Sequence, residues 1–133
     1  MDITLRRLVL ILTTMAVTLF SAEHANAQRD HRIIRLAKIE VDPTQLDSYN
    51  AALKEQMTTA VRVEPGVLTY YAVADKANPS HITILEIYAD TAAYQSHIQT
   101  SHFKKYKAAV QNMVKSLKLE DVNLIGVAVK PDR

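Results

Sequence analysis

Two histidines stand five residues apart in the segment YQSHIQTSHFKKY, residues 94–106. Imidazole titrates near neutral pH and also binds metals, so His97 and His102 could serve acid–base chemistry or hold an ion. Zinc sites on helices favour histidines four residues apart with a third ligand nearby. Here a helix break is predicted between the two histidines, and neither Glu86 nor Asp90 completes a known metal spacing. We therefore expect no metal, and two interpretations remain: proton transfer, or local hydrogen bonding at a helix junction.

One acidic residue and a pair of tyrosines are further candidates for chemistry. Glu86 lies in the middle of a predicted strand, on an apolar face. A carboxylate in such a place either has an ionic partner or a perturbed pKa, so an ion pair with Arg35 stays open beside a catalytic role. Successive side chains of a strand point to opposite faces, so Tyr70 and Tyr71 place one phenol on each face of the sheet. Either phenol could equally be part of the core.

The composition excludes several classes of protein. The net charge is only +2, and no basic run contains interleaved aromatic residues, so we expect no binding to nucleic acid. The chain has no cysteine, which excludes disulfides and a cysteine nucleophile. With only two glycines it cannot form a glycine-rich dinucleotide-binding loop.

The first 27 residues have the pattern of a secretory signal peptide. Arg6 and Arg7 precede an uncharged, mostly apolar run, Leu8–Phe20, and the run is followed by the small-residue motif Ala25-Asn26-Ala27. The apolar run is short for a membrane span, although an uncleaved anchor is the alternative. We expect removal of residues 1–27, a single domain at residues 28–133, a periplasmic or secreted location, and no attachment to a membrane after cleavage.

Apolar periodicity and turn signals divide the rest of the chain into seven elements. A strand at 32–41 ends at Asp42-Pro43, where Asp42 and Gln45 form the pattern of a capping box for a helix. That helix should end near Glu64-Pro65-Gly66. The remaining predictions are strands at 67–74 and 81–89, a short helix at 91–99, a helix capped by Ser101 that runs to about Ser116, and a strand at about 118–129.

The order β-α-β-β-α-α-β predicts the α+β ferredoxin-like fold, with a divided second helix and an antiparallel sheet. Its helices cover only one face of the sheet. Both faces of the predicted strands 67–74 and 81–89 nevertheless carry large apolar or aromatic residues. An open apolar face of that size predicts a partner, so we expect a homodimer through the open sheet face. The alternative is a monomer whose tail and loops cover that face.

The segments EPGVLTY at 64–70 and LEIYADTAAYQSHIQTSHFKKY at 85–106 resemble the antibiotic biosynthesis monooxygenase (ABM) family. The most specific part is the order E-x-Y-x-D-x-x-A-Y-x-x-H-x-x-[ST]-x-H-F, and the likeness extends over about 31–127. The resemblance implies a dimeric αβ barrel of ferredoxin-like subunits. It also implies a monooxygenase without metal, flavin or other cofactor, in which a deprotonated quinol-like or phenolic substrate itself passes an electron to O2.

Carried over to this chain, the resemblance assigns roles to particular residues. His97 and His102 match the histidines of the family, and Tyr88 stands where many members have Trp. We expect His97 to transfer protons, with Tyr88 and His102 as further catalytic residues. We expect four residues to line or orient the substrate pocket: Tyr71, Glu86, Ile84 and Met57. The alternative is a non-catalytic dimeric module of the same fold that binds haem or another aromatic ligand.

Overall fold

The computed structural model describes residues 31–131, so the predicted signal peptide lies outside the described residues. None of the helices within this range has the length and apolar character needed to cross a membrane. The elements are β1 (Ile33–Val41), η1 (Pro43–Gln45), α2 (Leu46–Val63), β2 (Val67–Ala74), β3 (His81–Tyr88), α3 (Thr91–His97), α4 (Ser101–Val110) and β4 (Val114–Asp121).

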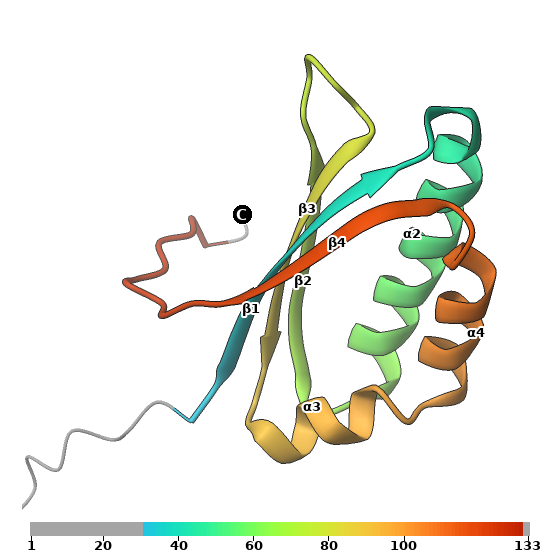
Figure 1. The fold of residues 1–133 in the computed structure, drawn as a ribbon. Helices are drawn as coiled ribbons and strands as arrows, with labels where there is room; N and C mark the ends of the chain where they lie inside the picture. Colours follow the sequence, from blue (N-terminus) through green and yellow to red (C-terminus); the bar gives the residue numbers. More distant parts are fainter. Residues whose placement is uncertain (1–30, 132–133) are drawn as a thin grey trace, which may run out of the picture. The chain divides into compact units, whose positions relative to one another are not determined.

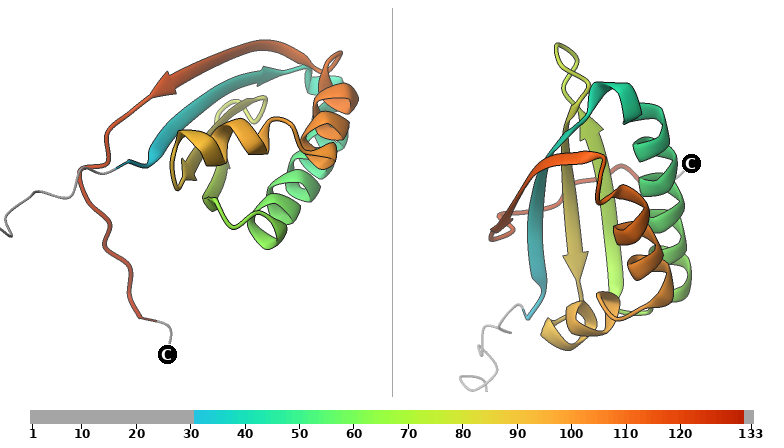
Figure 2. Two further views of the ribbon diagram at one scale, coloured as in Figure 1. Left: turned by 90° about the horizontal axis from the view of Figure 1, so that it is seen from below. Right: turned by 45° about the vertical axis from the view of Figure 1, so that its right-hand side comes forward.

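The four strands form one sheet in the order β2-β3-β1-β4, and every neighbouring pair is antiparallel. Helices α2 and α4 lie side by side over one face of the sheet, and α3 lies at one end of it (Figures 1 and 2). The predicted α+β ferredoxin-like fold with a divided second helix is therefore confirmed.

The turn between β1 and α2 is closed by Asp42. Its carboxylate accepts hydrogen bonds from the backbone N–H of Thr44, at 2.9 Å, and from the hydroxyl of Thr44, at 2.8 Å. Pro43 begins the short helix η1, where its missing N–H costs nothing. The expected capping box does not form, because the amide of Gln45 donates to the carbonyl of Asn112 at 3.3 Å instead.

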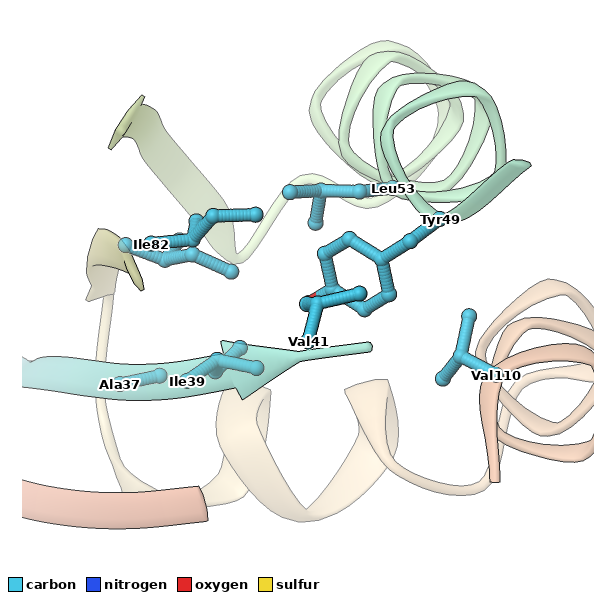
Figure 3. Packing of buried hydrophobic residues seen from close by; sticks show 8 residues of the cluster. Ala37, Ile39, Val41, Tyr49, Leu53, Ile82 and Val110 are labelled. Carbon is cyan, nitrogen blue, oxygen red and sulfur yellow. The ribbon is translucent and has the colours of Figure 1, made fainter. Parts of the chain in front are cut away.

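The core lies between the sheet and the two long helices. Figure 3 shows Tyr49 and Leu53 of α2 pointing toward Val41 and its strand, with Val110 of α4 beside them. Tyr49 and Val41 are fully buried. Burial of a side chain of this size contributes roughly 1.5–3 kcal/mol. Tyr49 and Leu53 are one helical turn apart, so their side chains point to the same side of α2. Their packing against the strands fixes α2 on the sheet.

The last helix is shorter than predicted, and the last strand begins earlier. Helix α4 ends at Val110, a turn follows in which the N–H of Met113 bonds to the carbonyl of Val110, and β4 pairs with β1 from Val114 to Asp121. The predicted helix to about Ser116 was therefore too long, and the predicted strand at about 118–129 exists but lies earlier in the chain. The apolar residues at 110, 113, 114 and 117 have helical spacing, and no glycine or proline marks the turn.

Strand β2 contains a β-bulge that changes which of its side chains face the helices. Val67 pairs with Tyr88, but Thr69 pairs with Ile87, so Leu68 is an extra residue in the ladder. Because side chains alternate along a strand, one extra residue exchanges the two faces for everything that follows. The site described next depends on this exchange.

Candidate functional site

A cavity of about 100 Å³ opens between the helix-covered face of the sheet and the helices. Much of its wall is apolar, including Leu53, Ile84, Ile98, Phe103, Leu117 and Leu119. Nine polar or charged residues also line it: Arg35, Gln56, Tyr70, Glu86, Tyr88, Tyr94, His97, Tyr106 and Lys107. Most of this polar group forms one continuous hydrogen-bonded series.

His97 owes its position to the junction between α3 and α4. Asp90 caps α3 by accepting from the N–H of Ala93 at 2.8 Å, and His97 is the last residue of that helix. The hydroxyl of Thr100 donates to the carbonyl of His97 at 2.7 Å and accepts from the N–H of Phe103 at 3.3 Å. Thr100, rather than the predicted Ser101, is therefore the cap of α4, and it ties α4 to His97.

The imidazole of His97 is fully buried and has a partner at each nitrogen. Nδ1 lies 2.9 Å from Oε1 of Glu64, and Nε2 lies 3.0 Å from the hydroxyl of Tyr70. The ring of Phe103 packs against it, with 4.9 Å between ring centroids. Burial lowers the pKa of His97, although the hydrogen bond to Glu64 and its negative charge act in the opposite direction. The buried ring is therefore held in the orientation that a proton carrier needs.

His102 does not reach the cavity. Its Nε2 lies 2.6 Å from Oε1 of Glu64, so both imidazoles bind the same carboxylate oxygen. Glu64 is the residue at which α2 ends, and its own N–H bonds back to the carbonyl of Ala60. His97 and His102 are thus joined through Glu64, which lies more than thirty residues upstream. Any effect of His102 on His97 passes through this carboxylate.

Glu64, His97 and His102 form the group of described residues that could hold a metal ion, with ligand atoms within 4.8 Å of one another. Two imidazoles and a carboxylate are a chemically suitable ligand set. Ligand atoms bound at roughly 2.0–2.2 Å around one tetrahedral zinc ion lie more than 3 Å apart, however. The separations of 2.9 and 2.6 Å to the Glu64 oxygen are those of hydrogen bonds. We therefore interpret the trio as hydrogen-bonded.

From His97 the hydrogen-bonded series continues across the sheet to an acidic residue. The hydroxyls of Tyr70 and Tyr88 lie 2.8 Å apart, and the hydroxyl of Tyr88 lies 2.9 Å from Oε2 of Glu86. Burial raises the pKa of both phenols. Burial also raises the pKa of Glu86, against the lowering effects of the Tyr88 hydrogen bond and of the positive charge on Arg35.

Arg35 faces Glu86 across the sheet but binds another acid. The two residues are directly opposite in the pairing of β1 with β3. The guanidinium donates through Nε to Asp121 at 2.8 Å and lies over the ring of Tyr94, 4.4 Å from its centroid. The ion pair considered for Glu86 is thus replaced by a hydrogen bond from Tyr88, which leaves the carboxylate directed toward the cavity wall.

Some of the predicted site residues line the cavity and others do not. Glu86 and Ile84 line the cavity, together with the predicted catalytic residues Tyr88 and His97. The expectation for Tyr71 is wrong: it pairs with Leu85 on the open face of the sheet and is 63% exposed.

The bulge at Leu68 explains the exchange of the two tyrosines. Without it, Tyr71 would share the face of Ile84, whereas with it Tyr70 pairs with Glu86 and faces the helices. The expectation for Met57 is also wrong, because Met57 packs against the core cluster and does not line the cavity.

Sequence reasoning missed Glu64 and Gln56 as site residues, and it assigned the pocket to Tyr71 rather than to Tyr70. Gln56 is 4% exposed and lies on the apolar face of α2 between Leu53 and Ala60. A polar residue on the apolar face of a helix could have indicated a site residue from the sequence alone. Its Nε2 lies 3.3 Å from Nε2 of His97, and its Oε1 is buried without a hydrogen-bond partner.

Comparison with known proteins places this chain in a family. The family model described as "Antibiotic biosynthesis monooxygenase" matches residues 32–109. The chain belongs to this family. A protein of Bacteroides thetaiotaomicron provisionally named an antibiotic biosynthesis monooxygenase is 51% identical to it. The match covers 77% of this chain and 97% of that one, with a TM-score of 0.72.

Other solved structures share the fold at lower identity. A protein of Lactobacillus acidophilus, provisionally named a monooxygenase, is 32% identical over 70% of this ABM chain and 44% of its own length, with a TM-score of 0.68. A Caulobacter crescentus protein, provisionally named an antibiotic biosynthesis monooxygenase, is 23% identical over 77% of this chain and 98% of its own; its TM-score of 0.68 shows the fold alone. No curated protein matches the chain significantly.

Proposed function

We propose that this ABM protein is a cofactor-independent monooxygenase that oxidises a quinol-like or phenolic aromatic with O2. The observation that carries the proposal is the cavity itself, an apolar space with one buried, hydrogen-bonded series of titratable groups in its wall. A quinol has an apolar ring that fits such a wall and an acidic hydroxyl that needs a base.

The size of the cavity supports a small ring. Its volume of about 100 Å³ is comparable with the roughly 150 Å³ of an engineered cavity that takes up benzene. A single aromatic ring therefore suits it better than a haem macrocycle. The haem-binding alternative has no observation of this kind in its favour.

The reaction balances without an added reductant. A hydroquinone loses one proton to a base, and the quinolate passes one electron to O2. The resulting pair of radicals combines to a carbon-bound peroxide, which takes the proton back and eliminates water. One hydroquinone and one O2 thus give one hydroxyquinone and one water. The protein contributes the apolar wall, the base and the returned proton.

Oxygen consumption tests the proposal. The mature protein is supplied with a panel of benzo- and naphthohydroquinones, and O2 uptake is compared with that of His97→Ala. With labelled O2, a monooxygenase places one labelled oxygen atom in the hydroxyquinone and the other in water, whereas simple oxidation to the quinone labels only hydrogen peroxide. Uptake no faster than that of the variant on every quinol would contradict the proposal.

The same proposal includes export and a homodimer. Residues 1–27 have the pattern of a signal peptide, so we propose that the mature chain begins at Gln28 and acts in the periplasm or outside the cell. Mass measurement of the protein recovered after export tests this start. The open sheet face carries the exposed Tyr71 and Val73, which supports a partner of the same kind.

A further inference from the structure

The hydrogen-bonded series at the cavity has two acidic ends. It runs from Glu64 through His97, Tyr70 and Tyr88 to Glu86, with successive contacts of 2.9, 3.0, 2.8 and 2.9 Å. Glu86 lies at the cavity, and Glu64 does not line it. We call these five residues the proton chain.

A count of hydrogens shows that the proton chain is one proton short when its residues are in their ordinary charge states. Each of the four contacts needs one hydrogen. A neutral imidazole supplies one and the two phenols supply one each, whereas ionised carboxylates supply none. One contact must then bring two acceptors together without a hydrogen between them. One additional proton completes every contact, so the geometry itself makes the proton chain a base.

Apart from a third arrangement with the proton on Glu64, the additional proton has two positions that keep all contacts hydrogen-bonded. It can be on Glu86, with both phenols donating toward His97. It can instead be on His97 as imidazolium, with both phenols donating toward Glu86. A shift of the phenolic hydrogens interconverts the two states without movement of the heavy atoms. The macroscopic titration then belongs to the whole proton chain rather than to one residue.

Gln56 supplies an independent indication of the second state. With its Nε2 directed at His97, its buried Oε1 has no partner. A buried acceptor without a donor costs about 1–3 kcal/mol. If His97 carries hydrogen on Nε2, a half-turn of the amide lets Oε1 share that hydrogen with the hydroxyl oxygen of Tyr70. Gln56 is therefore satisfied by a His97 ring that carries hydrogen on Nε2, as the imidazolium does, and unsatisfied by a neutral ring with its hydrogen on Nδ1.

We propose that the carboxylate of Glu86 takes the proton of a phenolic ligand in the cavity, that the proton chain holds this proton with His97 as its buried end, and that Glu86 returns it. The step rests on the proposed function for its ligand. The O–H bond of the quinol breaks, its electron pair stays on the quinolate oxygen, and an O–H bond forms on Glu86. Return of the proton to the peroxide restores the proton chain, so no net proton is needed.

Other charged and titratable groups lie beside Glu86, at the cavity wall and next to Glu64. Arg35 of β1 faces Glu86, and Lys107 of α4 and Tyr106 lie at the cavity wall. His102 of α4 binds Glu64 at the far end. The raised pKa of Glu86 and the lowered pKa of His97, both caused by burial, agree with Glu86 as the residue that takes up the proton.

A titration of the protein without ligand tests the proton chain. His97 ring nitrogens are followed by 15N NMR and the Glu86 carboxyl by 13C NMR after treatment with a chelator, and a His97→Asn variant assigns the ring signals. We expect one step with the same midpoint at both residues. Tyr88→Phe and Tyr70→Phe each interrupt the proton chain. In either variant, the titration of the Glu86 carboxyl should no longer change the 15N signals of the His97 ring.

The matched control is Tyr106→Phe, which removes a phenol at the same cavity wall whose hydroxyl bonds to Tyr49 rather than to the proton chain. It should keep the shared midpoint. Different midpoints in the unchanged protein, or a Glu86 step that is still seen at His97 in folded Tyr88→Phe and Tyr70→Phe, would overturn the proposal. If the midpoints agree but no quinol is oxidised, the proposed function fails and the proton chain stands.

Discussion

At the scale of single residues, Glu86 joins the cavity to a buried histidine. The sequence alone indicated an acid on an apolar face and a histidine at a helix junction, and the structure connects them through two tyrosines. Proton transfer at the ligand is therefore assigned to Glu86, and His97 acts through the phenols rather than by direct contact alone.

Removal of the carboxylate should lower turnover more than binding. Glu86→Gln keeps the shape of the side chain but cannot take up a proton, so we expect kcat for quinol oxidation to fall about 10²-fold or more, with a smaller change in KM. Steady-state O2 uptake over a range of quinol concentrations measures both constants. Tyr106→Phe serves as the control, and equal losses in the two variants would contradict a specific role for Glu86.

Glu86 should also affect stability in a pH-dependent way. Because its pKa in the folded protein is raised above the ordinary 4.5, the folded state holds the proton more tightly than the unfolded state. The free energy of unfolding of the unchanged protein should therefore fall as pH rises from 4.5 through the raised pKa. Relative to it, Glu86→Gln should gain stability over that range and keep the gain above it.

Urea unfolding at a series of pH values measures this difference. A difference between the two proteins that stays constant from pH 4 to pH 8 would show that the pKa of Glu86 is not raised.

At the scale of elements, the junction of α3 and α4 and the turn before β2 position His97 together. The sequence predicted the junction but displaced its cap by one residue, since Thr100 and Ser101 are both good caps. The contact between the turn and α3 was not predictable. It joins Gly66 to Ala93, which are far apart in sequence.

Thr100 should contribute more to stability than its neighbour. Thr100→Ala removes the cap of α4 and the bond to the His97 carbonyl, so we expect a loss of roughly 1–2 kcal/mol. Ser101→Ala, at the residue first expected to be the cap, should cost no more than about 0.5 kcal/mol. Thermal unfolding of both variants provides the comparison. Equal losses of stability would contradict the assignment of Thr100 as the cap of α4.

Gly66 allows the turn after α2 to approach α3. A Cβ at this position would overlap the Cβ of Ala93. Gly66→Ala should therefore destabilise the protein by about 1–3 kcal/mol, since such overpacking forces the backbone to move. The double variant Gly66→Ala with Ala93→Gly should recover most of the loss. A double-mutant cycle of unfolding free energies measures the coupling, and additive losses would rule out the overlap as the cause.

At the scale of the whole molecule, the pattern of apolar segments was sufficient to predict the fold, because a split β-α-β arrangement has few alternatives. It was not sufficient to place the end of α4, where apolar spacing fits a helix and a strand equally well. Nor could it show which of Tyr70 and Tyr71 faces the helices, because a one-residue bulge leaves no mark in composition.

The open sheet face should control assembly. If the proposed homodimer forms there, Tyr71→Lys together with Val73→Glu should convert it to a monomer, since charges would be buried at the interface. Light scattering after gel filtration gives the mass. Val61→Lys changes an exposed apolar residue of α2, on the other side of the fold, and should leave the mass unchanged. A mass that is insensitive to the sheet-face variant would place any interface elsewhere.

The bulge at Leu68 has a consequence for how related sequences are compared. Whether Leu68 is bulged out of the ladder, rather than the identity of the aromatic pair, decides which phenol enters the cavity. A relative with the same number of residues here but no bulge would turn its second aromatic residue toward the cavity and its first toward the open face, with every catalytic residue unchanged. An ungapped alignment of this segment therefore does not by itself identify the aromatic residue that lines the cavity.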